Sequence, residues 1–225
     1  MELDVADIPI NARYALMIGS IVPRPIAVVG TRDPEGRPNL APYSFFMGCG
    51  TEPMTLVISV ANPPGGEGEK DTLRNAKPVA EGGTGEFTVS VATEENIQRV
   101  VACAEPIPHG ESEFALAGLT PIPGSAVRAP RPAESPVTFE CRTLQVIRMA
   151  PGRPGGGNLL LGQVVRVHLA DGLANERLHV DADRLRAVGR MGGLDYCSTR
   201  ERGAIPSGVG ALAHAVEWVN RGPGR

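Results

Sequence analysis

Glycine and proline interrupt this chain so often that they limit the length of any regular element. The 225 residues include 28 Gly and 21 Pro, and both residue types favour turns and weaken helix interiors. Many short strands are therefore expected rather than a few long helices. An apolar fraction of 42% is ample for a core, but aromatic residues make up only 4%. Aliphatic side chains must supply most of the packing.

The apolar segments have the length of strands and are mostly joined by turn signals. Strands are predicted at 26–31, 39–46, 55–60, 87–92, 137–148 and 158–169. Residues 33–36 (DPEG) predict a hairpin turn between the first two strands. The continuous apolar segment 55–60 predicts a central strand. Because strands outnumber helices, a closed or partly closed antiparallel barrel is the expected architecture.

A few short helices complete the prediction. They are expected at 11–18, 71–77 and 93–104, with Asn11 and either Asp71 or Thr72 as N-caps, and with Thr93 and Asn96 flanking the first turn of the third. Residues 105–135 are proline-rich and are expected to be irregular. Residues 1–198 would form one domain. The tail, 199–225, has apolar residues at helical spacing and predicts a docked terminal helix that serves packing.

Several classes of partner are disfavoured by composition. A net charge of -3 and a pI near 5.9 give no electrostatic reason to expect nucleic acid. No apolar run approaches the roughly 18 residues of a membrane helix, and the acidic N-terminus is unlike a signal peptide. The four cysteines form no CxxC pair, which predicts reduced, mostly buried thiols and a cytoplasmic protein. The four histidines lack metal-ligand spacing, so no metal site is expected.

A glycine-rich loop precedes the second predicted helix, in the segment GGEGEKDTLRN at 65–75. It is not a P-loop, because Glu69 stands where glycine must precede the lysine and Asp71 separates Lys70 from Thr72. A helix N-terminus beside a lysine, hydroxyls and flexible backbone is nevertheless suited to an anion, above all a phosphate. The alternative is an ordinary capped surface helix with a solvated lysine.

Two other segments are candidates for ligand contact. Arg24 lies between two prolines and could meet a phosphate or a carboxylate, or form a structural ion pair. In NLAPYSFF, 39–46, Pro42 cannot donate to a sheet, and Tyr43 and Ser44 place hydroxyls among apolar neighbours. Free backbone groups beside hydroxyls suit a flat heteroaromatic ring; a strand bulge with core aromatics is the alternative. No dinucleotide-binding glycine motif or nucleophile triad is apparent.

The order and spacing of several blocks resemble one known family. The blocks are SIVPRPIAVVGTRDPEGRPNLAPYSFF, EPMTLVISV, KDTLRN, TGEFTVSV, SEFALAGLTPIP, SPVTFECRTLQV, LLLGQVVRVHL and VGRMGGLDYC. Over about residues 10–197 the chain is similar to the flavin reductase-like family of FMN-binding split β-barrels, which includes flavoredoxin.

This resemblance implies a fold, an assembly and a set of contacts. The fold would be mainly β with flanking helices, a Greek-key antiparallel split barrel, and the protein a homodimer with FMN at the subunit interface. The residues expected at the flavin ring are Ala41, Pro42, Tyr43, Ser44, Phe46 and Met47. Those expected around the phosphate or ribityl chain are Ser59, Lys70, Asp71 and Thr72, with Arg24 near the same pocket.

The resemblance also implies an NAD(P)H-dependent flavin reductase, with NADH or NADPH as reductant and no catalytic side chain, because the flavin would carry the chemistry. The electrons could pass to free flavin, a partner oxygenase or another redox protein. Two alternatives stay open. One is a non-enzymatic flavin electron carrier, and the other is a split-barrel binding module that has lost its cofactor.

Overall fold

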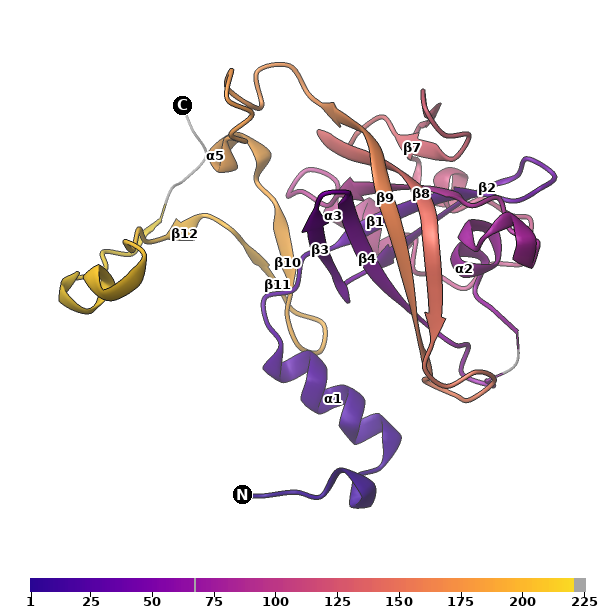
Figure 1. Cartoon of the computed structure of the whole chain (residues 1–225), viewed down its shortest axis with the longest axis horizontal. Coiled ribbons are helices and arrows are strands. Elements are labelled where there is room, and N and C mark those ends of the chain that lie inside the picture. Colours follow the sequence, from indigo (N-terminus) through magenta and orange to yellow (C-terminus); the bar gives the residue numbers. More distant parts are fainter. Residues whose placement is uncertain (67, 221–225) are drawn as a thin grey trace.

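Seven antiparallel strands dominate the computed structural model, which describes residues 1–66 and 68–220 (Figure 1). Their order in the sheet is β2-β1-β5-β8-β9-β4-β3. The strands are β1 (Ala27–Arg32), β2 (Pro38–Tyr43), β3 (Phe46–Thr51), β4 (Met54–Ala61), β5 (Glu86–Val91), β8 (Val137–Arg148) and β9 (Gly157–Leu169). The predicted mainly β, antiparallel architecture is confirmed.

The two edge strands of this sheet are consecutive in the chain. β2 ends at Tyr43 and β3 begins at Phe46, so only Ser44 and Phe45 connect one edge to the other. Because consecutive Cα atoms are about 3.8 Å apart, the sheet must curl until its edges converge at these two residues. The barrel is therefore split at the segment that contains the residues expected at the flavin ring. The prediction of one strand over 39–46 was wrong, since the chain changes strand at Ser44.

Smaller elements surround the sheet. The helices are α1 (Ile10–Ser20), α2 (Asp71–Ala76), α3 (Ile97–Ala102), α4 (Glu113–Ala117) and α5 (Ala182–Leu185), with 3-10 turns η1 (Val5–Asp7), η2 (Val79–Glu81) and η3 (Gly208–Ala213). The short strands pair as β6 (Pro121–Pro123) with β7 (Pro130–Pro132), β10 (Val188–Arg190) with β11 (Tyr196–Ser198), and β12 (Glu201–Arg202) with β13 (Val219–Asn220).

Two apolar clusters form the core. One fills the barrel around Phe87, Ile58 and Leu160, and the other lies between the outer side of β1 and β2 and the helices α3 and α4. Gly162 makes room for the largest side chain of the first cluster, because a Cβ there would lie 2.2 Å from Cζ of Phe87. Most residues in both clusters are aliphatic, as expected from the low aromatic content.

Several predicted boundaries require correction. α1 begins at Ile10 with Pro9 as its N-cap, and Asn11 lies inside the helix. α3 begins only at Ile97, because the Asn96 carboxamide accepts a hydrogen bond from the Thr93 N–H at 2.8 Å and closes a turn first.

The proline-rich segment 105–135 is not wholly irregular, since it contains α4 and the β6–β7 hairpin. The loop between these two strands is fastened to β8 by Glu140, which is fully buried. Its carboxylate accepts the backbone N–H groups of Ser125, Ala126 and Val127 at 2.8, 2.6 and 2.9 Å. Burial alone would raise the pKa of Glu140, but its bonds to His168 and these amides lower that pKa to about 2.

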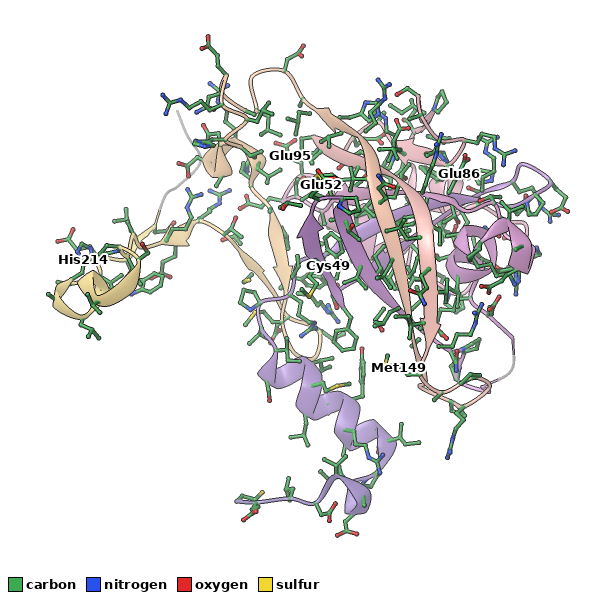
Figure 2. The ribbon with its side chains drawn as sticks, viewed as in Figure 1. Cys49, Glu52, Glu86, Glu95, Met149 and His214 are labelled. Carbon is green, nitrogen blue, oxygen red and sulfur yellow. The ribbon has the colours of Figure 1, made fainter. Side chains whose placement is uncertain are left out.

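The predicted docked helix in the tail is also wrong. η3 is a 3-10 turn, and it leaves Leu212 91% exposed. We call residues 199–220 the C-terminal arm. It is tied to the rest of the chain by ion pairs from Arg200 to Glu94 and from Arg202 to Asp183, and then extends away from the barrel, with His214 far from the packed side chains (Figure 2).

The cysteines are all free, as expected, but only Cys103 and Cys141 are buried. Cys49 is exposed on the edge strand β3 and Cys197 is half-buried on β11. The prediction of mostly buried thiols is therefore correct for two of the four positions.

Candidate functional site

The predicted site residues line three adjoining hollows at the split of the barrel. The Arg24 hollow, of about 300 Å³, is lined by Arg24, Ser44, Phe46, Met47 and Ser59 among others. The Lys70 hollow, of about 420 Å³, is lined by Ala41, Pro42, Tyr43, Lys70, Asp71 and Thr72 among others. A third, the tyrosine hollow, shares Pro42 and Tyr43 with the Lys70 hollow and Ser44 with the Arg24 hollow. Residues 42–44 therefore join all three.

Arg24 is buried and is committed to neighbouring groups of its own chain. Its Nη1 donates to the carbonyl oxygens of Ile18 and Ile21 at 2.6 and 2.8 Å, its Nη2 to that of Met191 at 2.9 Å, and its Nε to Ser44 Oγ at 3.2 Å. These bonds use four of the five guanidinium N–H groups. The ion pair considered as an alternative is therefore not what holds Arg24, and its side chain fixes Ser44 and the end of α1.

Apart from Arg24, Ser44 and Ser59 supply the polar side chains of a mostly apolar hollow. The Ser44 Oγ accepts from Arg24, which leaves its own O–H free to donate. Ser59 lies on β4, and its backbone N–H donates to the Phe45 carbonyl at 2.8 Å. This bond extends the β3–β4 pairing by one residue and holds Ser59 beside the short link that contains Ser44.

The Lys70 hollow contains a cation that lacks an acidic partner in the described part of the chain. Around it, Arg74 pairs with Asp71, Lys77 with Glu69 at 2.7 Å, and Arg148 with Glu69 at 3.0 Å. Within residues 1–66 and 68–220, no carboxylate forms an ion pair with Lys70, which is exposed at the N-cap of α2. Its charge is therefore available to a ligand.

The helix at this position differs from the one predicted. Neither Asp71 nor Thr72 caps it, because Lys70 occupies the N-cap and α2 has only six residues. The Asp71 carboxylate instead meets Arg74 and lies 3.0 Å from Nδ1 of His109. An anion at this site would depend on the Lys70 charge rather than on a long helix dipole.

The loop that carries Lys70 is held at its start by the neighbouring β8–β9 turn. Asn62 is buried, and its Nδ2 donates to the carbonyl oxygens of Ala150 and Arg153 at 2.9 Å each, in the β8–β9 turn. Asn158 Nδ2 donates to Asn62 Oδ1 at 2.7 Å. These hydrogen bonds fix the start of the glycine-rich loop, and the glycines that follow allow backbone conformations that other residues rarely adopt.

A buried polar wall completes the Lys70 hollow. The Asn39 carboxamide lies 3.1 Å from the Thr31 hydroxyl and 3.3 Å from the Thr72 hydroxyl. An orientation in which it accepts from both also lets it donate to Glu113 at 3.3 Å. The second Glu113 oxygen accepts the Leu40 N–H at 2.9 Å.

Burial raises the pKa of two groups in this wall. Burial raises the pKa of Tyr43 to about 12, against the opposing effect of its hydrogen bond with Thr72. Burial also raises the pKa of Glu113, although the bond from Leu40 acts in the other direction. The Tyr43 hydroxyl therefore keeps its proton at neutral pH.

Most of the chain matches the model of a known protein family. A family model described as "Flavin reductase like domain" matches residues 18–189. The chain belongs to this family. The resemblance predicted from the sequence is therefore confirmed, and so is the split-barrel fold.

Individual members of the family are also similar over most of their length. An uncharacterised protein of Halalkalibacterium halodurans is 38% identical over 87% of this chain and 91% of its own. The structure of nitrilotriacetate monooxygenase component B from Bacillus cereus is 32% identical, with a TM-score of 0.82 over 90% of this chain and 96% of its own. That of 2-nitrobenzoate 2-nitroreductase NbaA from Pseudomonas fluorescens is 28% identical, with a TM-score of 0.80 over 93% and 97%.

Family membership supports a flavin ligand and a flavin-reductase type of chemistry for this site. The hollows hold residues that sequence reasoning missed, namely Asn39, Glu113 and His109. Glu113 is 73 positions from Leu40, its partner, so no local pattern could have indicated it. Across the described residues no group of three or more His, Cys, Asp or Glu is arranged to hold a metal ion. No described helix is long and apolar enough to cross a membrane.

Proposed function

We propose that this protein is an FMN-binding flavin reductase that uses NADH or NADPH as reductant. The observation that carries the proposal is the continuity of the hollows at the barrel split. One hollow contains Lys70, which has no acidic partner among the described residues, and the next hollow is mostly apolar with two hydroxyls. A ligand with a phosphate and a flat polar-edged ring has matching chemistry.

The donor set fits FMN. Lys70 would hold the phosphate, with Thr72 beside it, and Asp71 would support this end through its pairs with Arg74 and His109. The ring would lie in the Arg24 hollow, where Phe46 and Met47 supply apolar wall and Ser44 and Ser59 supply hydroxyls. Ala41, Pro42 and Tyr43 would line the path between the two ends.

FMN, when bound, supplies the hydride chemistry, and the protein supplies binding and orientation. Ser44 is the best-placed donor, because Arg24 fixes its oxygen and leaves its O–H free. The apolar walls exclude water, which strengthens such a hydrogen bond. No side chain of the chain is required to transfer a proton in this scheme.

A homodimer is part of the proposal. The helix α1 contains no buried residue, and Ile10 and Leu16 on it are 59% and 47% exposed. An isolated helix of this length is marginal in water, since helical stability in proteins comes mostly from tertiary packing. A second copy covering α1 and the adjoining Arg24 hollow would provide that packing and place the flavin at the interface.

The destination of the electrons is also a proposal. One relative is named as component B of a monooxygenase, which supports a role in supplying reduced flavin to a partner oxygenase. The four free thiols fit a reducing compartment and support a cytoplasmic location.

One anaerobic titration tests this function. Protein loaded with FMN is mixed with NADH or NADPH, and the flavin absorbance is followed. Rapid bleaching by one nicotinamide is the expected result. Retention of FMN without bleaching by either would instead indicate an electron carrier supplied by protein partners. Failure to bind FMN at all would leave only the binding-module alternative.

A further inference from the structure

All three tyrosines of the chain meet in one place. Tyr14 on α1, Tyr43 at the end of β2 and Tyr196 on β11 line the tyrosine hollow. They come from segments that are far apart in the sequence and lie together only in the fold. Aromatic faces stack with flat rings, and tyrosine adds a hydroxyl at the rim. The convergence of all three on one hollow favours a flat aromatic ligand.

The hollow also carries positive charge. Arg190 on β10 lies over Tyr196, with its Cζ 4.3 Å from the ring centroid. Its Nη2 donates to the Gly193 carbonyl at 2.5 Å, and no acidic side chain in the described part of the chain forms an ion pair with it. Arg24 is close by, because the backbone N–H of each of these two arginines donates to the carbonyl oxygen of the other, at 2.9 and 2.8 Å. An anionic group would be attracted to this wall.

We propose that the tyrosine hollow binds a flat aromatic ring that carries an anionic group, as a second ligand beside the flavin. This inference rests on the proposed function, because Ser44 lines both this hollow and the Arg24 hollow that would hold the flavin ring. Tyr196 would stack on the ring, and Arg190 would meet the anion. The family model ends at residue 189, before either of these two residues.

The size of the hollow limits what it can hold. Its volume is about 230 Å³, below the roughly 300–1,000 Å³ of pockets that enclose a drug-sized ligand. It therefore fits the ring portion of a larger molecule or a small aromatic acid. A nicotinamide dinucleotide, an additional flavin mononucleotide and an aromatic carboxylate share this chemistry, and the experiment separates them.

The test measures equilibrium binding to the FMN-loaded protein. The probes are NAD⁺, NADP⁺, additional FMN and 2-nitrobenzoate, each titrated by calorimetry. Arg190→Gln removes the charge, and Tyr196→Leu removes the aromatic face. Tyr196→Phe keeps the ring, and Arg177→Gln removes an exposed arginine that lines none of the three hollows. Retention of the first FMN and the melting temperature are measured for every variant, so that a folding defect is detected.

At least one probe should bind the wild-type protein, and both Arg190→Gln and Tyr196→Leu should weaken it by about tenfold or more. Tyr196→Phe and Arg177→Gln should bind that probe as the wild type does. The probe whose binding is weakened by both substitutions identifies the class of molecule that places its ring in the tyrosine hollow. If Tyr196→Leu does not fold, Arg190→Gln decides alone.

The proposal is overturned if no probe binds at about 1 mM, or if the bound probe is insensitive to Arg190→Gln. Failure of the proposed function gives a different result. In that case NADH and NADPH leave the bound flavin unbleached, while a probe still binds in a manner that depends on Arg190 and Tyr196.

Discussion

At the scale of single residues, Lys70 is the side chain on which the orientation of the ligand depends. It is one of only two lysines in the chain, and the other, Lys77, is paired with Glu69. Lys70→Ala should weaken FMN binding by about tenfold to a hundredfold, since a charge-assisted contact contributes roughly 1.5–3 kcal/mol. Riboflavin, which has the same ring without the phosphate, should bind the variant as it binds the wild type. Fluorescence titration with both flavins measures this ratio.

Ser44→Ala is the matched control for the other end of the ligand. It removes a hydroxyl from the Arg24 hollow and the acceptor of an Arg24 hydrogen bond, so it should weaken FMN and riboflavin by similar factors. Lys70→Ala should therefore reduce the ratio of the FMN affinity to the riboflavin affinity, whereas Ser44→Ala should leave this ratio unchanged. Equal affinities of the wild type for the two flavins would show that Lys70 does not contact a phosphate.

The residue scale also shows how far sequence reasoning can reach. Pro42, Tyr43 and Ser44 could be recognised because hydroxyls and a proline are unusual inside an apolar strand. Asn39 and Glu113 could not, because their importance comes from burial against each other and against Thr72. Arg24 was recognised as unusual, but its carbonyl partners, one of them 167 positions away at Met191, carry no side-chain signature.

At the scale of elements, the C-terminal arm is held partly by the ion pair between Arg200 and Glu94. Acid should break this pair by protonating the Glu94 carboxylate. The bond from Arg200 is the main cause that lowers the pKa of Glu94 to about 2, with burial opposing it and Arg186 assisting. A pKa below the ordinary value of about 4.5 means that this attachment is fully present above pH 4.5 and is lost as the pH falls towards 2. The arm should therefore be released within that window.

Trp218, the only tryptophan of the chain, lies on the arm and is 63% exposed, so its fluorescence anisotropy reports the arm alone. Glu94→Gln should lower this anisotropy at pH 7 towards the value that the wild type reaches in acid, with the Arg202–Asp183 pair still in place, while far-UV circular dichroism shows an intact barrel. Glu95→Gln is the control, because Glu95 is exposed and pairs only with Arg186 among the described residues. Unchanged anisotropy in Glu94→Gln would mean that Glu94 does not hold the arm.

Elements were predictable from sequence where one segment fixes its own structure. The long strands β8 and β9 and the helix α2 agree with their predicted positions to within a residue or so, because apolar pattern and turn residues at both ends define them. The β6–β7 hairpin was missed, because a strand made of two prolines and one other residue has no strand pattern. The arm was misjudged because helical spacing of apolar residues does not require that the same chain provides the surface they cover.

At the scale of the whole molecule, the barrel split is the feature that no local pattern could indicate. The sequence predicts the strands but not their order, and the order places β2 and β3 at opposite edges of one sheet. The two-residue link at Ser44 then brings both edges together and creates the hollows between them. A site at such a junction becomes visible only when the topology is known, or when a family resemblance supplies it.

The apolar side chains exposed by the described residues predict an obligate dimer. Figure 1 shows α1 and the C-terminal arm reaching away from the barrel, and both expose apolar side chains. Obligate interfaces often exceed about 2,000 Å² in total, and α1 beside the Arg24 hollow would contribute to one. Sedimentation at several protein concentrations should show a dimer. Any dissociation of this dimer should be accompanied by release of FMN.

Met17→Glu places a charge on the exposed face of α1, and it should shift the protein to a monomer, lower its helix content and weaken FMN binding together, because one interface would support all three. Val79→Glu, at an even more exposed apolar residue on η2, should change none of them. A stable wild-type monomer that retains FMN would contradict the assembly. It would mean that one chain completes the flavin site and that α1 is stabilised by contacts within its own chain.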